Sequence, residues 1–139
     1  MADLDHFKSV NDRYGHLVGD GVLREVAARL MGSLRPYDSI GRYGGEEFLI
    51  VEPGCTLEKA TMLAERLRQF IAGEIIRQPS IDVAITCSLG VAYAIQTEDL
   101  DHILKAADAA LYRAKLQGRN RVVACPASEA ILNATPVGR

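Results

Sequence analysis

Apolar residues recur three or four positions apart in four segments of the chain, which is the spacing of one face of an α-helix. The segments run from His6 to Tyr14, from Asp20 to the residues before Pro36, from Thr56 to Ala72 and from Asp99 to Gln117. The residues expected to face inward are Phe7, Val10, Tyr14, Val22, Leu23, Val26, Ala27, Leu30, Met31, Leu57, Ala60, Leu63, Ala64, Leu67, Ile71, Leu100, Ile103, Leu104, Ala107, Leu111 and Ala114. The sequence therefore predicts four helices, each with one buried face.

Glycine, aspartate and proline mark the expected ends of these helices. Gly15 and Gly118 are expected to stop the first and fourth helices, because glycine accepts the left-handed backbone that ends many helices. Asp20 suits the N-cap of the second helix, since its carboxylate can accept hydrogen bonds from free backbone N–H groups. Pro36 closes the same helix.

Runs of alternating or continuous apolar residues predict the strands between these helices. A short strand is expected before Asp5, a hairpin over residues 38–51, a long strand over 81–95 and a last short strand from Arg121 to Ala124. This order of elements indicates an α/β protein of the α+β kind, with a central, mostly antiparallel sheet flanked by helices.

Three features of the strands and the tail refine this prediction. Gly44-Gly45 is expected to form the hairpin turn with positive φ, and Gly90 is expected to bend the long strand. The continuous apolar run from Phe48 to Val51 is typical of a strand buried on both faces. Residues 126–139 carry two prolines and no apolar period, so we expect a domain over 1–125 and a disordered tail.

Composition and charge limit the classes of function. With 139 residues, 48% of them apolar and 24% charged, the chain suits one globular domain. A net charge of −2 leaves no broad basic surface, so we expect neither nucleic acid nor a membrane as a partner. The longest apolar run is too short to span a bilayer, and the first ten residues do not resemble a signal peptide.

Cysteine usage indicates the compartment. Cys55, Cys87 and Cys125 are widely spaced and form no metal-binding pair with each other or with histidine, so neither a disulfide framework nor a zinc site is predicted. We therefore expect a domain of the reducing cytoplasm, although a longer protein containing it could be anchored in a membrane through other segments.

Two groups of acidic residues are candidates for metal binding. Asp3 and Asp5 lie two positions apart at the end of a strand, so both can face one hard cation. The alternative, which the pattern alone favours, is a charged strand end with Asp5 capping a helix. Glu46 and Glu47 follow the hairpin glycines, where adjacent carboxylates repel each other unless a metal or a proton lies between them; a solvated turn explains them equally well.

Other polar groups are candidates for binding an anionic nucleotide. Lys8, Asn11 and Asp20 combine a cation with two side chains that can read the hydrogen-bonding edge of guanine, although Asn11 also suits a surface position and Asp20 a cap. Lys115 and Arg119 suit terminal phosphates, or equally the negative end of a helix dipole.

A further arginine and aspartate pair precedes the hairpin. Arg35 and Asp38 are spaced as R-x-x-D, and the planar guanidinium of arginine can bind phosphate or a guanine edge through two hydrogen bonds. The alternative is an ordinary surface ion pair, which contributes little.

Together these groups resemble the ordered sequence blocks of one family. The blocks are Asp3-Leu4-Asp5-His6-Phe7-Lys8-x-x-Asn11-Asp12, Tyr14-Gly15-His16, Gly19-Asp20, Arg42-Tyr43-Gly44-Gly45-Glu46-Glu47-Phe48, Ser88-Leu89-Gly90-Val91-Ala92, Ala107-Asp108-Ala109-Ala110-Leu111-Tyr112-Arg113-Ala114-Lys115 and Gly118-Arg119-Asn120-Arg121. In this order, over about residues 2–124, they resemble the GGDEF domains, or diguanylate cyclases, in the GGEEF form of the signature.

The resemblance implies a palm-like fold related to nucleotidyl cyclases and polymerases. It implies condensation of two GTP molecules into cyclic di-GMP with release of two pyrophosphates. Two Mg²⁺ or Mn²⁺ ions per GTP would be held by Asp3, the carbonyl of Leu4, Glu46 and the neighbouring Glu47 of the signature turn, which Gly44, Gly45 and Phe48 complete. Glu46 would also accept the proton of the 3′-hydroxyl.

The resemblance also implies the residues that contact substrate and product. Asn11 and Asp20 would read guanine, and Lys8 would neutralise charge on the transferred phosphate. The residues implied at the phosphates are Phe7, Lys8, Lys115 and Arg119. An inhibitory site for the product cyclic di-GMP would be formed by Arg35 and Asp38, with Arg42 as a supporting contact.

The family reaction requires a second copy of the domain, because each copy binds one GTP. Family members have a helix, a loop and a full strand before the Asp-x-Asp motif, whereas Met1-Ala2 alone precede it here. We therefore expect a fragment with an incomplete first strand, weak or absent activity by itself, and fusion in the full protein to an upstream sensor or dimerising domain. The alternatives are a non-catalytic domain that binds GTP or cyclic di-GMP, and a general metal-dependent nucleotidyl transferase.

Overall fold

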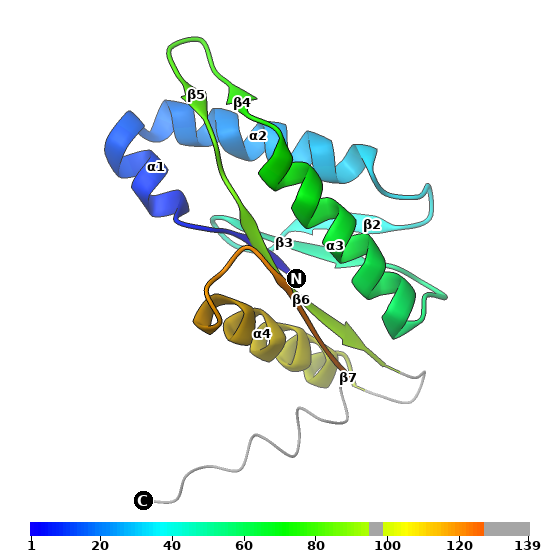
Figure 1. The fold of residues 1–139 in the computed structure, drawn as a ribbon. Helices are drawn as coiled ribbons and strands as arrows, with labels where there is room; N and C mark the ends of the chain where they lie inside the picture. Colours follow the sequence, from blue (N-terminus) through cyan, green and yellow to red (C-terminus); the bar gives the residue numbers. More distant parts are fainter. Residues whose placement is uncertain (95–98, 127–139) are drawn as a thin grey trace, which may run out of the picture.

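The computed structural model describes residues 1–94 and 99–126, and it places a five-stranded sheet between helices on both faces (Figure 1). The elements in chain order are β1 (Ala2–Leu4), α1 (Phe7–Tyr14), α2 (His16–Gly32), β2 (Ser39–Arg42), β3 (Glu47–Val51), α3 (Leu57–Gly73), β4 (Ile76–Arg77), β5 (Asp82–Val83), β6 (Cys87–Tyr93), α4 (Leu100–Leu116) and β7 (Val122–Pro126). The predicted fold class is confirmed, including the four helices and the hairpin of β2 and β3.

The short strand β1 lies at the centre of the sheet, whose order is β2-β3-β1-β6-β7. All neighbouring pairs are antiparallel except β6 and β7, which run parallel. Asp3 lies opposite Glu47 on β3 and opposite Ser88 on β6. The sheet therefore places Asp3 directly beside Glu47, the last acidic residue of the signature turn.

The two faces of the sheet carry different helices. Ala2 and Leu4 of β1 belong to the main core, which also contains buried residues of α1, α2 and α3. Met1 belongs to a second cluster with Ala107 and Leu111 of α4. Because side chains alternate along a strand, Asp3 faces the same side as Met1, towards α4.

Gly90 permits α4 to approach the sheet closely. A Cβ atom at this position would lie 2.2 Å from the carbonyl oxygen of Ala107 and 2.3 Å from the backbone nitrogen of Leu111. The expected bend at Gly90 is wrong, because β6 runs from Cys87 to Tyr93 through it. The long predicted strand breaks earlier instead, between β5 and β6, and β5 pairs with β4 in a small hairpin that the sequence pattern did not indicate.

Two backbone predictions near the site are also wrong. Helix α2 begins at His16, so Asp20 lies inside the helix and is not its N-cap. The turn glycines Gly44 and Gly45 do not have left-handed φ; within the described residues the glycines that do are Gly15, Gly54 and Gly118. Gly15, at φ 86°, does end α1 as predicted, and its N–H donates to the carbonyl of Asn11.

Some apolar residues that the sequence pattern predicts to be buried are exposed, where pockets open at the surface. Val51 is 50% exposed, which contradicts burial of β3 on both faces, because α4 covers β6 and β7 and leaves the end of β3 open. Met31 and Leu100, expected to be inward, are 61% and 64% exposed and line two of the pockets. Strand β7 extends to Pro126, and the predicted tail beyond it lies outside the described residues.

Within the described part of the chain, no helix has the length and apolar character needed to cross a membrane.

Candidate active site

Acidic residues gather where β1 meets the start of β3. Asp3 is 5% exposed, and its strand neighbour Leu4 donates its backbone N–H to the carbonyl of Glu46 at 3.2 Å. Burial raises the pKa of Glu46, and the negative charges of Asp3 and Glu47 raise it further, while Lys115 lowers it. The structure thus brings Asp3 next to Glu46 and Glu47, which follow it by more than forty positions in the sequence.

Lys115, at the end of α4, supplies a positive charge to this cluster. Its Nζ lies 3.0 Å from Oδ2 of Asp3. Burial raises the pKa of Asp3, whereas the hydrogen bond and charge of Lys115, and the charge of Arg119, lower it; the net direction is upward. A helix-dipole role explains a lysine in the last turn of α4, but it does not explain why the ammonium reaches Asp3.

The donor set fits a hard divalent cation. Carboxylate and carbonyl oxygens are the ligands that Mg²⁺ and Mn²⁺ prefer, and Asp3, Glu46 and the carbonyl of Leu4 supply these atoms. The Asp3 carboxylate already holds one cationic group, the Lys115 ammonium. Over residues 1–94 and 99–126, no three or more His, Cys, Asp or Glu side chains are arranged as a ready metal cluster.

Asp5 has a different role from Asp3. It is buried, and its Oδ2 accepts from the Thr86 hydroxyl at 2.7 Å and from the Asn120 backbone N–H at 3.0 Å, while its Oδ1 accepts from the Ser88 hydroxyl at 2.7 Å. These contacts occupy the carboxylate, so the idea that both aspartates face one cation is not what the structure shows. Asp5 is not a helix cap either, because His6 precedes the first residue of α1.

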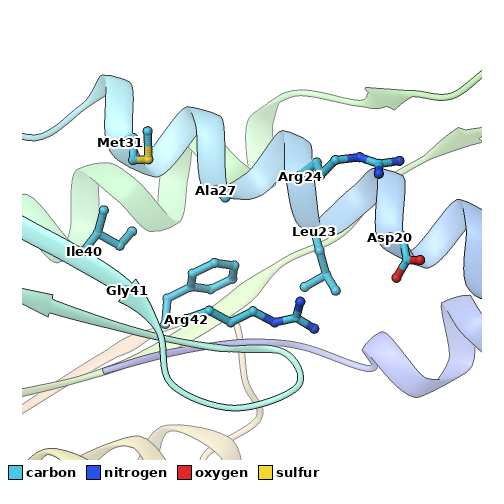
Figure 2. A pocket seen from close by; sticks show the side chains of 9 residues that line it. Asp20, Leu23, Arg24, Ala27, Met31, Ile40, Gly41 and Arg42 are labelled. Carbon is cyan, nitrogen blue, oxygen red and sulfur yellow. The ribbon is translucent and has the colours of Figure 1, made fainter.

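A pocket of about 410 Å³ opens between α2 and the β2–β3 hairpin (Figure 2). It is lined by Asp20, Leu23, Arg24, Ala27, Met31, Ile40, Gly41, Arg42 and Phe48. Ligand pockets of this size commonly combine apolar walls with a few polar groups, as here. Asn11 lies close by, because its Oδ1 occupies the space that a side chain at Gly19 would need, one residue before Asp20.

The start of α1 lies next to the acidic cluster in the chain. Phe7 is buried, so its side chain belongs to the core, whereas Lys8 is exposed. Both residues are in the first turn of α1, where backbone N–H groups have no partner within the helix. A phosphate contact by Phe7 would therefore use its backbone.

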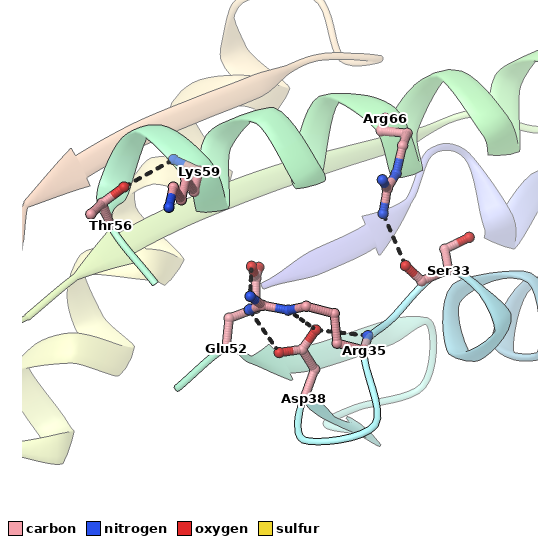
Figure 3. Close-up of polar contacts among 7 residues, drawn as sticks. All are labelled: Ser33, Arg35, Asp38, Glu52, Thr56, Lys59 and Arg66. Atoms are coloured by element: carbon pink, nitrogen blue, oxygen red, sulfur yellow. Dashed lines mark hydrogen bonds and ion pairs between the residues drawn. The ribbon is translucent and has the colours of Figure 1, made fainter. Parts of the chain in front are cut away.

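Arg35 and Asp38 form a tight local pair before β2 (Figure 3). The Arg35 side chain donates to Asp38 at 3.1 and 3.0 Å, its backbone N–H donates to the same carboxylate at 2.9 Å, and its guanidinium stacks 4.7 Å from the Tyr37 ring. These bonds keep the pKa of Asp38 below its usual value. Both residues of the predicted inhibitory motif are thus held in a fixed relation.

Residues of α3 face this pair and were missed at the sequence level. A pocket of about 460 Å³ is lined by Arg35 together with Lys59 and Arg66, and Arg66 donates to the carbonyl of Ser33 at 3.0 Å (Figure 3). Three cationic side chains therefore border one pocket. Nothing in the local sequence separates Lys59 and Arg66 from Arg68, the third cation of α3.

Arg42 lies away from Arg35, at the other end of β2. Its guanidinium contacts the signature turn and donates to the carbonyls of Gly44 and Gly45. The structure therefore does not join Arg42 to the pair of Arg35 and Asp38 that the resemblance associates with it.

Comparison with known proteins supports the resemblance. The family model described as "Diguanylate cyclase, GGDEF domain" matches residues 1–121. The diguanylate cyclase DgcP of Pseudomonas aeruginosa is 44% identical over 122 residues, which is 88% of this chain and 18% of DgcP.

Solved structures show the same fold. The GGDEF domain of DgcB from Caulobacter crescentus, in complex with c-di-GMP, is 38% identical with a TM-score of 0.84 and covers 88% of this chain and 74% of that one. The active GGEEF domain of a diguanylate cyclase from Vibrio cholerae is 36% identical with a TM-score of 0.80, covering 88% and 78%. The chain spans between 18% and 41% of the length of the curated relatives that it matches.

Proposed function

Because this chain belongs to the GGDEF family of diguanylate cyclase domains, we propose that it condenses two GTP molecules into cyclic di-GMP and two pyrophosphates. The observation that carries the proposal is the cluster of Asp3, Glu46 and Lys115, which brings a buried acid, a half-buried acid and a cation together.

In the proposed reaction the 3′-hydroxyl oxygen of one GTP attacks the α-phosphorus of the other. An O–P bond forms, the bond to pyrophosphate breaks, and the hydroxyl proton passes to the Glu46 carboxylate. A divalent cation held by Asp3, Glu46 and the carbonyl of Leu4 would supply charge stabilisation to the phosphate oxygens. Diguanylate cyclases of this family generally depend on such a metal.

The cationic and polar residues would orient the substrate. Lys8, Lys115 and Arg119 would neutralise the triphosphate, since fixed positive charges are most effective where negative charge develops. Asn11 and Asp20, at the junction of α1 and α2, would pair with the edge of guanine and reject adenine.

A second copy of the domain would complete the reaction. Each copy offers one such pocket, and both ester bonds of the cyclic product form if two copies face each other about a two-fold axis. The specific activity should therefore rise with protein concentration in the range where the copies associate.

The proposed function is tested by following pyrophosphate release from GTP with Mg²⁺ or Mn²⁺, over a range of protein concentrations, with ATP as the control nucleotide. We expect slow release with GTP and none with ATP, accompanied by cyclic di-GMP in a chromatographic assay. Binding of cyclic di-GMP without any pyrophosphate, even at high protein concentration, would contradict the proposal and support a regulatory binding domain.

We further propose that the pocket beside Arg35 binds the product. The Arg35→Ala variant is expected to bind cyclic di-GMP at least about tenfold more weakly in calorimetry, since hydrogen bonds to charged groups contribute about 1.5–3 kcal/mol. Its turnover at low product concentration should be unchanged. The exposed Arg77 of β4 is the matched control, and Arg77→Ala should keep the wild-type affinity. Equal product affinity in wild type and Arg35→Ala would refute this site.

A further inference from the structure

Arg42 closes over the tip of the signature turn. Its Nε donates to the carbonyls of Gly44 and Gly45 at 3.2 and 3.0 Å, and its Nη2 donates to Gly45 at 2.6 Å. Figure 2 shows its side chain crossing the floor of the nucleotide-sized pocket towards this turn. One side chain therefore holds both glycine carbonyls of the turn.

Apart from Arg42, the contacts of the turn among the described residues lie at its base and at Gly44, where a Cβ atom would lie 2.6 Å from Oε2 of Glu47. Adjacent glycines have more backbone freedom than any other pair of residues. A Cβ atom built at Gly45 would have no heavy atom within 4 Å, so neighbouring side chains do not confine it. The base of the turn is closed by the N–H groups of Tyr43 and Gly44, which donate to the carbonyl of Glu47 at 2.8 and 3.4 Å. These bonds close the base but leave the Gly44 and Gly45 carbonyls to Arg42.

Glu46 lies between two anchored carbonyls. Its own carbonyl accepts the backbone N–H of Leu4, and the carbonyl before it, that of Gly45, accepts from Arg42. The first anchor belongs to the central strand β1 and the second to the end of β2. The direction in which the Glu46 side chain leaves the backbone is thus fixed from both sides.

We propose that Arg42 is a positioning residue for the cyclase reaction. Its guanidinium holds the signature turn in place, so that the Glu46 carboxylate stays beside Asp3 and Lys115. This inference rests on the proposed function for its catalytic consequence, but the hold of Arg42 on the turn is a property of the free protein. This role differs from a role in product binding, because Arg42 lies at the end of β2 whereas Asp38 of the proposed product site precedes β2.

Lysine cannot replace this function fully. The guanidinium is planar and presents several N–H groups in a rigid fork, whereas lysine carries a single compact ammonium on a flexible stem. Arg42→Lys keeps the charge in the pocket, but its ammonium lacks the planar fork that aligns two N–H groups with the turn. The Lys variant therefore separates the effect of charge from the effect of the fork.

The experiment compares wild type, Arg42→Ala, Arg42→Lys and the control Arg77→Ala in two measurements. The first is hydrogen–deuterium exchange of the amides of residues 44–47 in the free protein. Arg42→Ala should exchange there at least about tenfold faster than wild type, Arg42→Lys by an intermediate factor, and Arg77→Ala at the wild-type rate.

The second measurement separates turnover from binding. For Arg42→Ala we expect kcat for pyrophosphate release to fall by about 10²-fold, the loss typical of a misplaced catalytic group. The Kd for 3′-deoxyGTP, which lacks the attacking hydroxyl, should rise by a much smaller factor than kcat falls, because Arg42 also lines the pocket, and the Kd for cyclic di-GMP should stay within about threefold of wild type. Arg42→Lys should recover part of kcat.

Distinct outcomes overturn the inference. If the amides of residues 44–47 exchange at the same rate in Arg42→Ala as in wild type, Arg42 does not hold the turn in place. This outcome is decisive whether or not the wild type turns over GTP. Unchanged kcat, or a loss confined to product affinity, assigns Arg42 to another role. Absence of turnover in the wild type would refute the proposed function instead, and the exchange data would still decide whether Arg42 holds the turn in place. If Arg42→Ala does not fold, the same comparisons are made with Arg42→Lys.

Discussion

Glu46→Gln should lower the rate of pyrophosphate release from GTP by about 10³-fold, within the range expected when a general base is removed. Glutamine has nearly the same shape as glutamate but cannot accept the 3′-hydroxyl proton, and it is a poorer metal ligand. Burial already disfavours the charged form of Glu46, since it raises the pKa of this carboxyl, so the neutral amide should not destabilise the fold. The loss should therefore fall on turnover.

The control for this variant is Glu74→Gln, because Glu74 is exposed after the end of α3. Wild type and the two variants are compared by their initial rates at saturating GTP and metal. Their affinities for cyclic di-GMP are compared by calorimetric titration. Glu46→Gln should bind the product as tightly as wild type does. A rate within about threefold of wild type would exclude Glu46 as the proton acceptor.

Asp5→Ala should have the largest effect on stability, a loss of about 3–5 kcal/mol in the free energy of unfolding. The substitution removes an acceptor from two hydroxyls and one backbone N–H, which belong to Thr86, Ser88 and Asn120. Ser88 is fully buried, so its hydroxyl has no access to water after the change. The loop that carries Arg119 also loses its tie to the centre of the sheet.

Urea denaturation of wild type, Asp5→Ala, Asp5→Asn and Asp12→Ala measures this effect. Asp12 is an exposed aspartate of α1, and its replacement should change the unfolding free energy by no more than about 0.5 kcal/mol. Asp5→Asn keeps one acceptor oxygen and should fall between wild type and Asp5→Ala. A loss below about 1 kcal/mol for Asp5→Ala would mean that the three donors find other partners.

Periodicity predicted the long elements well and failed on short or functional ones. The four helices span eight residues or more, enough to establish a helical period, whereas β4 and β5 have two residues each and leave no alternation to detect. Asp20 looked like a cap because capping and ligand binding use the same side chain. Its place inside α2 depends on a helix that starts four residues earlier, at His16.

The candidate site divides in the same way. Its acids and cations were identifiable from sequence blocks, but the division of labour between Asp3 and Asp5 was not, since it depends on hydroxyls more than eighty residues away. Arg42 was grouped with Arg35 through the resemblance. Only the geometry at the end of β2 shows that its hydrogen bonds go to the turn.

The contacts of Asp3 and Asp5 also set an order of events during synthesis. Asn120 is 115 residues from Asp5, and Lys115 is 112 residues from Asp3 (115 minus 3). A chain emerging from the ribosome displays both aspartates first and must wait for α4 and the following loop before either meets its partner. At about 5–20 residues per second, that interval lasts several seconds. Neither aspartate therefore has its partner until the domain is almost complete.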